Sequence, residues 1–392
     1  MPHILFEKHN SNNIAQKEDK LLKTSFNFMA QSTYDQKIGF IIDGKECLLT
    51  KVEKNEKSLV KLDNATRLTP VGLMKTALND YAILSEEKVL FSNATSIHNR
   101  IEPEEDYLKN IEYFTNEFQT NKEIWVEVGF GSGVHLLHQA RENPDKLIIG
   151  LEIHTPSIEQ VLKQVKVENI ENILVINYDA RLFLEFLKSN TVGRIFVHFP
   201  VPWDKKPHRR VFSDEFIEES LRVLKIGGTL ELRTDSPNYY EYSSGLLDHF
   251  KEYPSTIDKN KDLAVTSKYE ARWKRQEKDI WDITITSTNN SDEISLDGDF
   301  TFPIVDDLDK LKKTILEFTV VKDEFLIHFE TVYEIENTNR RDFLIKVTFG
   351  SFNRPVTKYI IVENNQPRYF QGDPIKTKTN LKAHKKIIES FK

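Results

Sequence analysis

The segment IWVEVGFGSG, residues 124–133, decides the fold class of this 392-residue chain. Its first half is an apolar run typical of a buried strand, and its second half places Gly129, Gly131 and Gly133 at alternate positions. Glycine adopts positive φ freely and leaves room for a bulky ligand beside the backbone, so the segment predicts a strand that turns tightly into a helix. A dinucleotide-binding G-x-G-x-x-G turn would need its third glycine at Val134.

Four more apolar runs follow, with helical patterns between them. The runs are KLIIGLEI (146–153), NILVINYDA (172–180), GRIFVHF (193–199) and GTLELRT (228–234). The helical patterns are VHLLHQAREN (134–143), SIEQVLKQVKVEN (157–169), RLFLEFLKS (181–189) and FIEESLRVLK (216–225). Near-continuously apolar strands that alternate with helices predict an α/β fold with a parallel, doubly wound, Rossmann-like sheet. Ligands of such sheets bind at the carboxyl ends of the strands.

The regions on either side of this block have a different texture. Residues 1–95 predict a small β-rich extension with a hairpin turn at Asp43-Gly44. The α/β block takes residues 96–287, a polar stretch at 288–299 is interpreted as a linker, and residues 300–392 predict an α+β extension. We find no internal repeat in the sequence.

Composition narrows the class of protein. The net charge of −7 argues against a uniformly basic surface, but it leaves room for a local phosphate-binding patch. The single cysteine, Cys47, lies in an apolar run, so we expect it in a core and expect no intramolecular disulfide or cysteine-based metal site. There is no run of eighteen apolar residues and no secretory pattern at the N-terminus, and we expect a cytoplasmic protein without metal or membrane contacts. A monomer is compatible with all these features.

Acidic residues stand at the ends of the first three strands. Glu127 precedes the glycines, Glu152 ends the second strand and Asp179 follows the third. Carboxylates placed there can accept hydrogen bonds from ribose hydroxyls, in the case of Glu152, and from an adenine amino group, in the case of Asp179. The E-x-G-x-G-x-G form resembles motif I of class I S-adenosylmethionine-dependent methyltransferases, in which the first acid lies near the methionine ammonium.

Six motifs in order carry a closer resemblance. VEVGFGSG, GLEIH, NYDA, FPVPWDKKPHRR, ELRTDS and SKYEARWKRQEKDIWD, within residues 120–287, resemble the bacterial tRNA (guanine-N7-)-methyltransferase family. The resemblance implies methyl transfer from S-adenosylmethionine to N7 of a guanine in tRNA, namely the variable-loop guanine at position 46. It implies that the cofactor is bound by Glu127, Gly129, Gly131, Gly133, Glu152 and Asp179. It also implies that the substrate contacts Lys205, Asp235, Ser267, Lys268, Tyr269 and Glu270.

The loop after the fourth strand departs from the family pattern F-P-D-P-W, because Val201 stands where the family has its catalytic aspartate. Guanine N7 carries a lone pair and no proton at neutral pH, so methyl transfer to it needs alignment rather than a general base. Asp204 and Asp235 are the candidate catalytic replacements, as stabilisers of the positive charge that develops on the base. Asp204 can equally be a solvated loop acid.

Basic residues follow the same loop. Lys205, Lys206, His208, Arg209 and Arg210 predict a phosphate-binding edge, and Arg272, Lys274, Arg275 and Lys278 predict a second one. Trp203 is expected to anchor the loop in the core, and His154 and His198 are expected to be structural. The terminal run Lys376–Lys392 is either a helix that contacts RNA or a solvated one. Two alternative functions stay open: an RNA-binding protein that has lost catalysis, and a methyltransferase of the same fold with another substrate.

Overall fold

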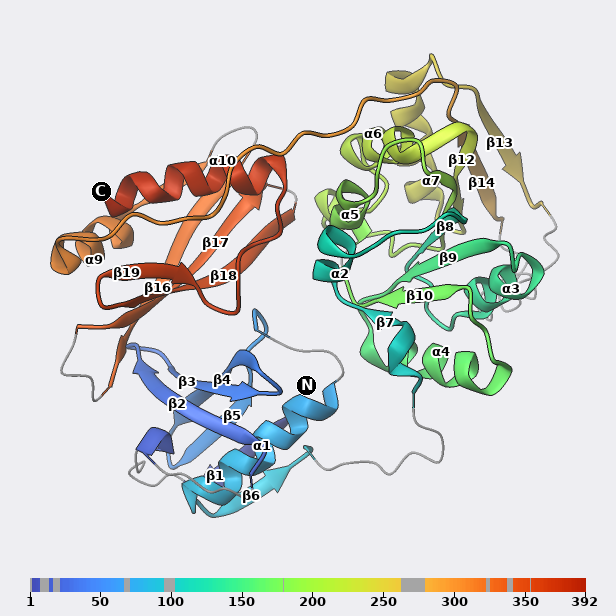
Figure 1. Ribbon diagram of the computed structural model, residues 1–392. Helices are drawn as coiled ribbons and strands as arrows, with labels where there is room; N and C mark the ends of the chain where they lie inside the picture. The colour runs from blue at the N-terminus through green and yellow to red at the C-terminus, as the bar shows by residue number, and fades with distance from the viewer. Residues whose placement is uncertain are drawn as a thin grey trace. The chain divides into compact units, whose positions relative to one another are not determined.

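A computed structural model describes the chain in residues 2–7, 14–16, 22–66, 71–94, 103–178, 180–261, 279–321, 325–336, 341–352 and 354–392 (Figure 1). The chain divides into two compact units. Asn99–Ser295 forms one unit, and Met1–His98 together with Leu296–Lys392 forms the other. Within the described ranges, no helix is long and apolar enough to cross a membrane.

The Asn99–Ser295 unit is built on an eight-stranded sheet with the order β13-β14-β12-β11-β8-β9-β10-β7. Its strands are β7 (Leu108–Lys109), β8 (Glu123–Val128), β9 (Lys146–Leu151), β10 (Ile173–Ile176), β11 (Val192–His198), β12 (Leu224–Thr234), β13 (Ser255–Lys259) and β14 (Trp281–Thr286). Strands β7 to β12 run parallel to one another, and β14 is antiparallel to both β12 and β13. This arrangement confirms the predicted α/β class and doubly wound sheet.

The strand order reverses between β8 and β11. The chain first moves outward from β8 to β9 and β10, and then returns to place β11 on the other side of β8. In open α/β sheets, the crevice at such a switch point is where ligands bind. The glycine turn after β8 and the HFPVPW loop after β11 both begin at this crevice.

Helices cover both faces of the sheet (Figure 1). They are η2 (Glu105–Tyr107), α2 (Ile111–Asn116), α3 (Val134–Glu142), α4 (Thr155–Glu168), α5 (Ala180–Phe183), η3 (Leu184–Phe186), η4 (Pro207–Arg209), α6 (Asp214–Val223), α7 (Pro237–Leu246) and η5 (Leu247–Phe250). One core cluster lies between the sheet and α6 and α7, and a second lies between the sheet and α3 and α4. Ser213 caps α6 by accepting a hydrogen bond from the Phe216 amide at 3.3 Å.

The stretch interpreted as a linker belongs in part to this unit. The side chain of Asn190 donates to the Ser291 carbonyl at 2.8 Å and accepts from the Ser291 amide at 2.9 Å. The Ser189 hydroxyl donates to the Asp292 carbonyl at 2.7 Å. These bonds hold Ser291 and Asp292 against the α/β unit, which extends to Ser295, so the structure differs from the proposed boundary at 288.

The second unit consists of one eleven-stranded sheet made by both ends of the chain. Its elements from the N-terminal end are β1 (His3–Glu7), η1 (Ile14–Gln16), β2 (Thr24–Gln31), β3 (Gln36–Ile42), β4 (Lys45–Lys54), β5 (Lys57–Leu62), α1 (Val71–Ser85) and β6 (Val89–Ser92). Those from the C-terminal end are α9 (Leu308–Glu317), β15 (Thr319–Val321), β16 (Leu326–Ile335), β17 (Phe343–Ser351), β18 (Arg354–Glu363), β19 (Gln366–Tyr369), α10 (Lys378–Ile387) and η6 (Ile388–Phe391). The two predicted extensions are therefore joined in one unit rather than separate.

The two ends of the chain repeat one design. Strands β2 to β5 followed by α1 correspond to strands β16 to β19 followed by α10, and the turns fall at a constant offset. Ile42 pairs with Lys45 where Ser351 pairs with Arg354 (351 − 42 = 309), and Lys54 pairs with Lys57 where Glu363 pairs with Gln366 (363 − 54 = 309). The absence of a repeat in our sequence analysis was therefore wrong at the level of structure, because the halves share register and turn positions but few identical residues.

The two copies meet through equivalent strands. Strand β2 pairs antiparallel with β16, at Gln31 with Glu334 and Ala30 with Ile335. Such pairing of like with like is the relation expected about a two-fold axis. An apolar cluster with members from both halves, including Leu48 and Ile361, closes the junction. Cys47 lies beside it, fully buried as expected, and burial raises the pKa of its thiol to about 12.

Candidate functional site at the switch point

The glycine turn after β8 has the positive-φ backbone that its sequence predicts. The φ angles of Gly129, Gly131 and Gly133 are +69°, +54° and +73°, a region that residues with a side chain rarely adopt. A Cβ atom on Gly133 would lie 2.1 Å from Cγ2 of Val161 on α4, so this glycine is also required for packing. A Cβ on Gly129 would meet nothing within 4 Å. The turn therefore leaves open space for a ligand on the side where a side chain would stand.

Glu152 supports this turn from the next strand. One of its carboxylate oxygens accepts a hydrogen bond from the Gly131 amide at 2.9 Å. The other oxygen accepts from the Ile153 and His154 amides at 2.8 and 2.9 Å. Three of the roughly four acceptor positions of the carboxylate are thus used by backbone groups. The structure brings Glu152 to the predicted crevice, and its contact with ribose stays a prediction.

Glu127 is buried at the end of β8 and is held by a side chain of α3. Nδ1 of His135 lies 2.8 Å from Oε2 of Glu127, and Nε2 of the same ring lies 3.0 Å from the amide nitrogen of Gln139. A carboxylate oxygen accepts, so Nδ1 of His135 donates in its contact with Glu127. The chain Gln139–His135–Glu127 therefore fixes the orientation of the ring and of the carboxylate.

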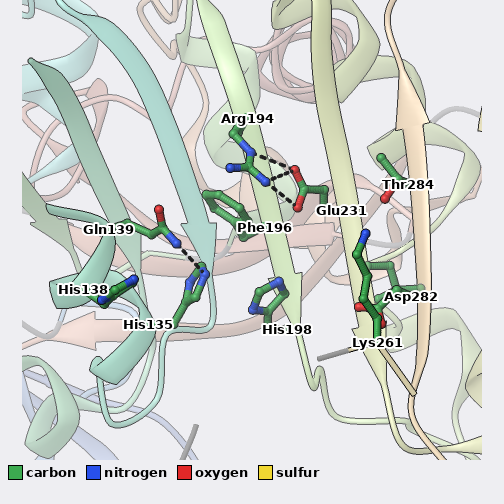
Figure 2. A pocket seen from close by; sticks show the side chains of 11 residues that line it. His135, His138, Gln139, Arg194, Phe196, His198, Glu231, Lys261, Asp282 and Thr284 are labelled. Carbon is green, nitrogen blue, oxygen red and sulfur yellow. Dashed lines mark hydrogen bonds and ion pairs between the residues drawn. The ribbon is translucent and has the colours of Figure 1, made fainter. Parts of the chain in front are cut away.

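A pocket of about 220 Å³ opens beside these hydrogen-bonded side chains, on the face of the sheet that α3 covers (Figure 2). Arg194, Phe196 and His198 line it from alternate positions of β11. Arg194 forms a bidentate pair with Glu231 of β12 at 2.8 and 2.9 Å. The remaining lining residues are His135, His138, Gln139, Leu232, Lys261, Asp282 and Thr284. The sequence analysis missed this pocket, although Arg194, Phe196 and His198 alternate with aliphatic residues along β11, a period-two signal that could have indicated it.

The electrostatics of the pocket favour a neutral His198. Burial, with His135, Arg233 and Arg194 nearby, lowers the pKa of His198 well below its ordinary value. Its ring packs against those of His135 and Phe196, with centroids 4.5 and 5.6 Å away. Arg233 is itself fully buried and forms two hydrogen bonds to Asp282, at 2.7 and 2.8 Å. These contacts agree with the expectation that His198 is structural.

The HFPVPW loop is strained and is anchored by an arginine. Phe199 and Trp203 have φ angles of +50° and +46°, which are rare for bulky residues. Arg210 is 7% exposed and donates to the Pro202 carbonyl at 2.8 Å. Its guanidinium lies over the ring of Tyr242, 4.5 Å from the centroid. Arg210 thus anchors the loop through its bond to the Pro202 carbonyl. Because its side chain is buried, it is not placed on the predicted phosphate-binding edge.

Trp203 does not have the core position expected of it. Its side chain is 38% exposed, and the guanidinium of Arg209 lies 5.2 Å from its ring centroid. The prediction was wrong because Arg210, rather than the tryptophan, supplies the buried anchor. Lys205 and Arg209 are exposed as a phosphate-binding edge requires. Val201 is 61% exposed.

The two candidate catalytic acids lie after neighbouring parallel strands. Asp235 is half-buried directly after β12, one residue before Ser236, which caps α7. Asp204 is half-exposed in the loop after β11, with Arg210 and the amide of Asn238 each 3.4 Å from Oδ1. Asp179, Ser267, Lys268, Tyr269, Glu270 and the basic run Arg272, Lys274, Arg275 and Lys278 lie outside the described residues.

The sheet with its switch point, the glycine turn and the acids beside it define a Rossmann-like methyltransferase unit. A family model described as a putative methyltransferase matches residues 121–283. Among solved structures, the 16S rRNA methyltransferase KamB aligns at a TM-score of 0.35 with 18% identity, over 45% of this chain and 92% of that one. We therefore assign the fold from the strand order of the sheet and not from this likeness.

Relatives at higher identity place the chain in a particular family. The tRNA (guanine-N(7)-)-methyltransferase of Wolinella succinogenes is 40% identical over 357 residues, which cover 89% of each chain. That of Helicobacter hepaticus is 35% identical over 379 residues, covering 89% of this chain and 93% of the relative. The chain belongs to the tRNA (guanine-N7-)-methyltransferase family. Because these alignments are longer than the Asn99–Ser295 unit, the relatives share part of the second unit as well.

Proposed function

We propose that the protein transfers a methyl group from S-adenosylmethionine to N7 of a guanine in tRNA, and that this guanine is the variable-loop residue at position 46. The observation that carries the proposal is the 40% identity over 357 residues to a relative named for this activity. The glycine turn at the switch point of the sheet supports it, because its open side suits a bulky cofactor.

The chain's own residues do the positioning. Bound S-adenosylmethionine supplies a methyl group on a positively charged sulfur. Transfer would form the bond from guanine N7 to the methyl carbon as the bond from that carbon to sulfur breaks, so no residue of the protein would need to move a proton. Glu127 and the glycine turn hold the cofactor, while Lys205 and Arg209 hold the RNA backbone. Such alignment can lower a barrier by about 7–11 kcal/mol.

The exposed Val201 does not remove a necessary base, since N7 arrives deprotonated. It removes one carboxylate that could stabilise the cationic base. Asp235 takes that part in our proposal, because it ends the strand beside β11 and is half-buried next to the crevice. Asp204 is less suited, since its side chain is 50% exposed in the loop after β11.

The proposed activity is tested by incubating the protein with methyl-labelled S-adenosylmethionine and tRNA and locating the label as alkali-labile N7-methylguanine. A matched tRNA with 7-deazaguanine at position 46 has no lone pair at that site, so we expect it to receive no methyl group. Label at another atom would contradict the proposed reaction. An active protein that also labels the 7-deaza tRNA would contradict the proposed position.

The role of Asp235 is tested by the Asp235→Asn variant, which keeps the size of the side chain and removes its charge. We expect the turnover number to fall about 10²–10³-fold, as for the loss of a single charge-stabilising group, with cofactor affinity unchanged. Asp204→Asn is the matched control, with a fall of less than tenfold. Near-normal turnover of Asp235→Asn would contradict the assignment.

A further inference from the structure

Helix α10 presents lysines on the face turned away from the sheet. Lys378, Lys382 and Lys385 are exposed and follow each other at spacings of four and three residues, which places them on one face of the helix. The opposite face buries Leu381, Ala383, His384 and Ile387. At 1.5 Å per residue, the three charges are spread along about 10 Å of helix. We call these three residues the α10 lysine face.

The helix is a rigid platform for these charges. Thr377 caps it by accepting a hydrogen bond from the Asn380 amide at 3.1 Å. The buried His384 ring lies 3.0 Å from the Tyr369 hydroxyl and 3.1 Å from the Thr301 carbonyl. Burial lowers the pKa of His384, which favours a neutral ring.

The duplicated half of the unit shows that packing alone does not require this charge. Helix α1 follows β5 as α10 follows β19, and it packs on the strands of its own half of the sheet. In fifteen residues, VGLMKTALNDYAILS, α1 has one lysine and one aspartate. In ten residues, KTNLKAHKKI, α10 has four lysines and no acid. The same structural position is thus filled once by a neutral helix and once by a strongly basic one.

We propose that the α10 lysine face is a second docking surface for the tRNA backbone, outside the methyltransferase unit. The inference rests on the proposed function, which makes a highly charged RNA the partner. In a chain with a net charge of −7, a concentrated basic face is complementary to phosphates. Lysine binds phosphate as a point charge without reading bases, which suits a surface that positions the RNA rather than selects a sequence.

The test is the triple variant Lys378→Gln, Lys382→Gln, Lys385→Gln in the full-length protein. We expect the Kd and KM for tRNA to rise at least tenfold at constant turnover number and constant cofactor affinity. In a salt titration, the slope of log K against log salt should shrink by about one for each lysine that contacts a phosphate. The same three residues changed to arginine should restore wild-type binding.

The matched control is Lys45→Gln, Lys54→Gln, Lys57→Gln, three exposed lysines on the N-terminal copy with the same loss of charge. We expect it to bind tRNA as the wild type does. An equal loss of affinity in this control would overturn the proposal, because the effect would then be one of net charge. If the wild type is active and the α10 variant has an unchanged KM and salt slope, the proposal is overturned as well. That outcome covers the case in which the face binds an acidic protein or a membrane surface instead of tRNA. A wild type that does not methylate tRNA would instead contradict the proposed function.

Discussion

At the scale of single residues, the site depends on side chains that hold other side chains. His135 orients Glu127, Glu152 supports the Gly131 amide, and Arg210 anchors the loop at Pro202. The sequence predicted Glu127 and Glu152 at the crevice, because acids that end successive parallel strands must meet at one edge of the sheet. It did not predict His135 or the position of Arg210, since neither contact follows from spacing along the chain.

His135 positions the proposed cofactor ligand, so its loss should weaken cofactor binding. Replacing it by phenylalanine keeps a ring and removes the hydrogen bond to Glu127. A hydrogen bond to a charged group contributes about 1.5–3 kcal/mol, so we expect the Kd for S-adenosylmethionine to rise at least tenfold. Calorimetric titration measures it, with His154→Phe as control. An unchanged Kd at an unchanged melting temperature would contradict the positioning role.

His198 makes the stability of the methyltransferase unit sensitive to acid. Its folded-state pKa is lowered from the ordinary 6.5, so below about pH 6.5 the unfolded chain binds a proton that the folded chain does not. This contribution to stability is complete above pH 6.5 and is lost as the pH falls.

We expect the melting temperature to drop between about pH 6.5 and pH 5 and the drop to be smaller in His198→Asn. All four tryptophans lie in the Asn99–Ser295 unit, so their fluorescence reports its unfolding selectively. His154→Asn controls for the loss of an imidazole, and we expect it to keep the wild-type drop. Equal drops in the wild type and His198→Asn would show that His198 is not the group responsible.

At the scale of elements, the local sequence predicted where most helices and strands begin and end. The helix expected at 181–189 is an exception, because a tertiary contact shortens it. The pattern RLFLEFLKS predicted a helix over 181–189, but α5 ends at Phe183 and continues only as the short helix η3. The buried Arg222 of α6 donates to the carbonyls of Leu184 and Leu187, at 2.8 and 3.1 Å. Because the Arg222 guanidinium already bonds to these carbonyls, they need no hydrogen bond from a further helical turn. Arg222 is distant in sequence, so the local pattern does not reveal this contact.

Alanine substitutions in the glycine turn separate the cost of a positive φ from the cost of a steric clash. Gly133→Ala combines a positive φ with a Cβ only 2.1 Å from Val161, whereas Gly129→Ala has the positive φ and open space. We expect Gly129→Ala to lower the free energy of unfolding by about 1–2 kcal/mol and Gly133→Ala by a further 1–3 kcal/mol or so. Urea unfolding followed by tryptophan fluorescence measures both.

The double variant Gly133→Ala, Val161→Ala should recover the steric part of the loss. Val161 is β-branched and stiff on α4, so it cannot turn away from the new methyl group. No coupling between the two substitutions would contradict the packing argument.

At the scale of the whole molecule, the unit made by the two chain ends is tied together by a buried charged network. The ammonium of Lys37 lies 3.0 Å from Asp63 and 2.8 Å from the Thr50 hydroxyl. The Tyr359 hydroxyl, from the other half, donates to the same Asp63 oxygen at 2.8 Å. In the repeat, Lys346 and Tyr359 occupy the register positions of Lys37 and Thr50, but Lys346 is only partly buried and pairs with Glu330.

Lys37→Met leaves Asp63 buried without its cation, so we expect the free energy of unfolding of this unit to fall by about 3–5 kcal/mol. Lys346→Met, at the equivalent register position, removes a more exposed pair and should cost about 1 kcal/mol or less. Urea unfolding followed by circular dichroism compares them, with tryptophan fluorescence reporting the other unit. Equal losses would show that the network does not hold the two halves together.

The sequence by itself determined the doubly wound fold, the glycine turn, the acids at the crevice and the family, because these depend on local periodicity and on residues at fixed spacing. Only the tertiary structure decided that the two ends of the chain form one duplicated sheet, that Arg210 rather than Trp203 anchors the loop, and that His135 holds Glu127. The physical reason is the same in each case. These contacts join residues from different elements, and pairing in a sheet or burial of a charge is decided by the partner that folding brings near.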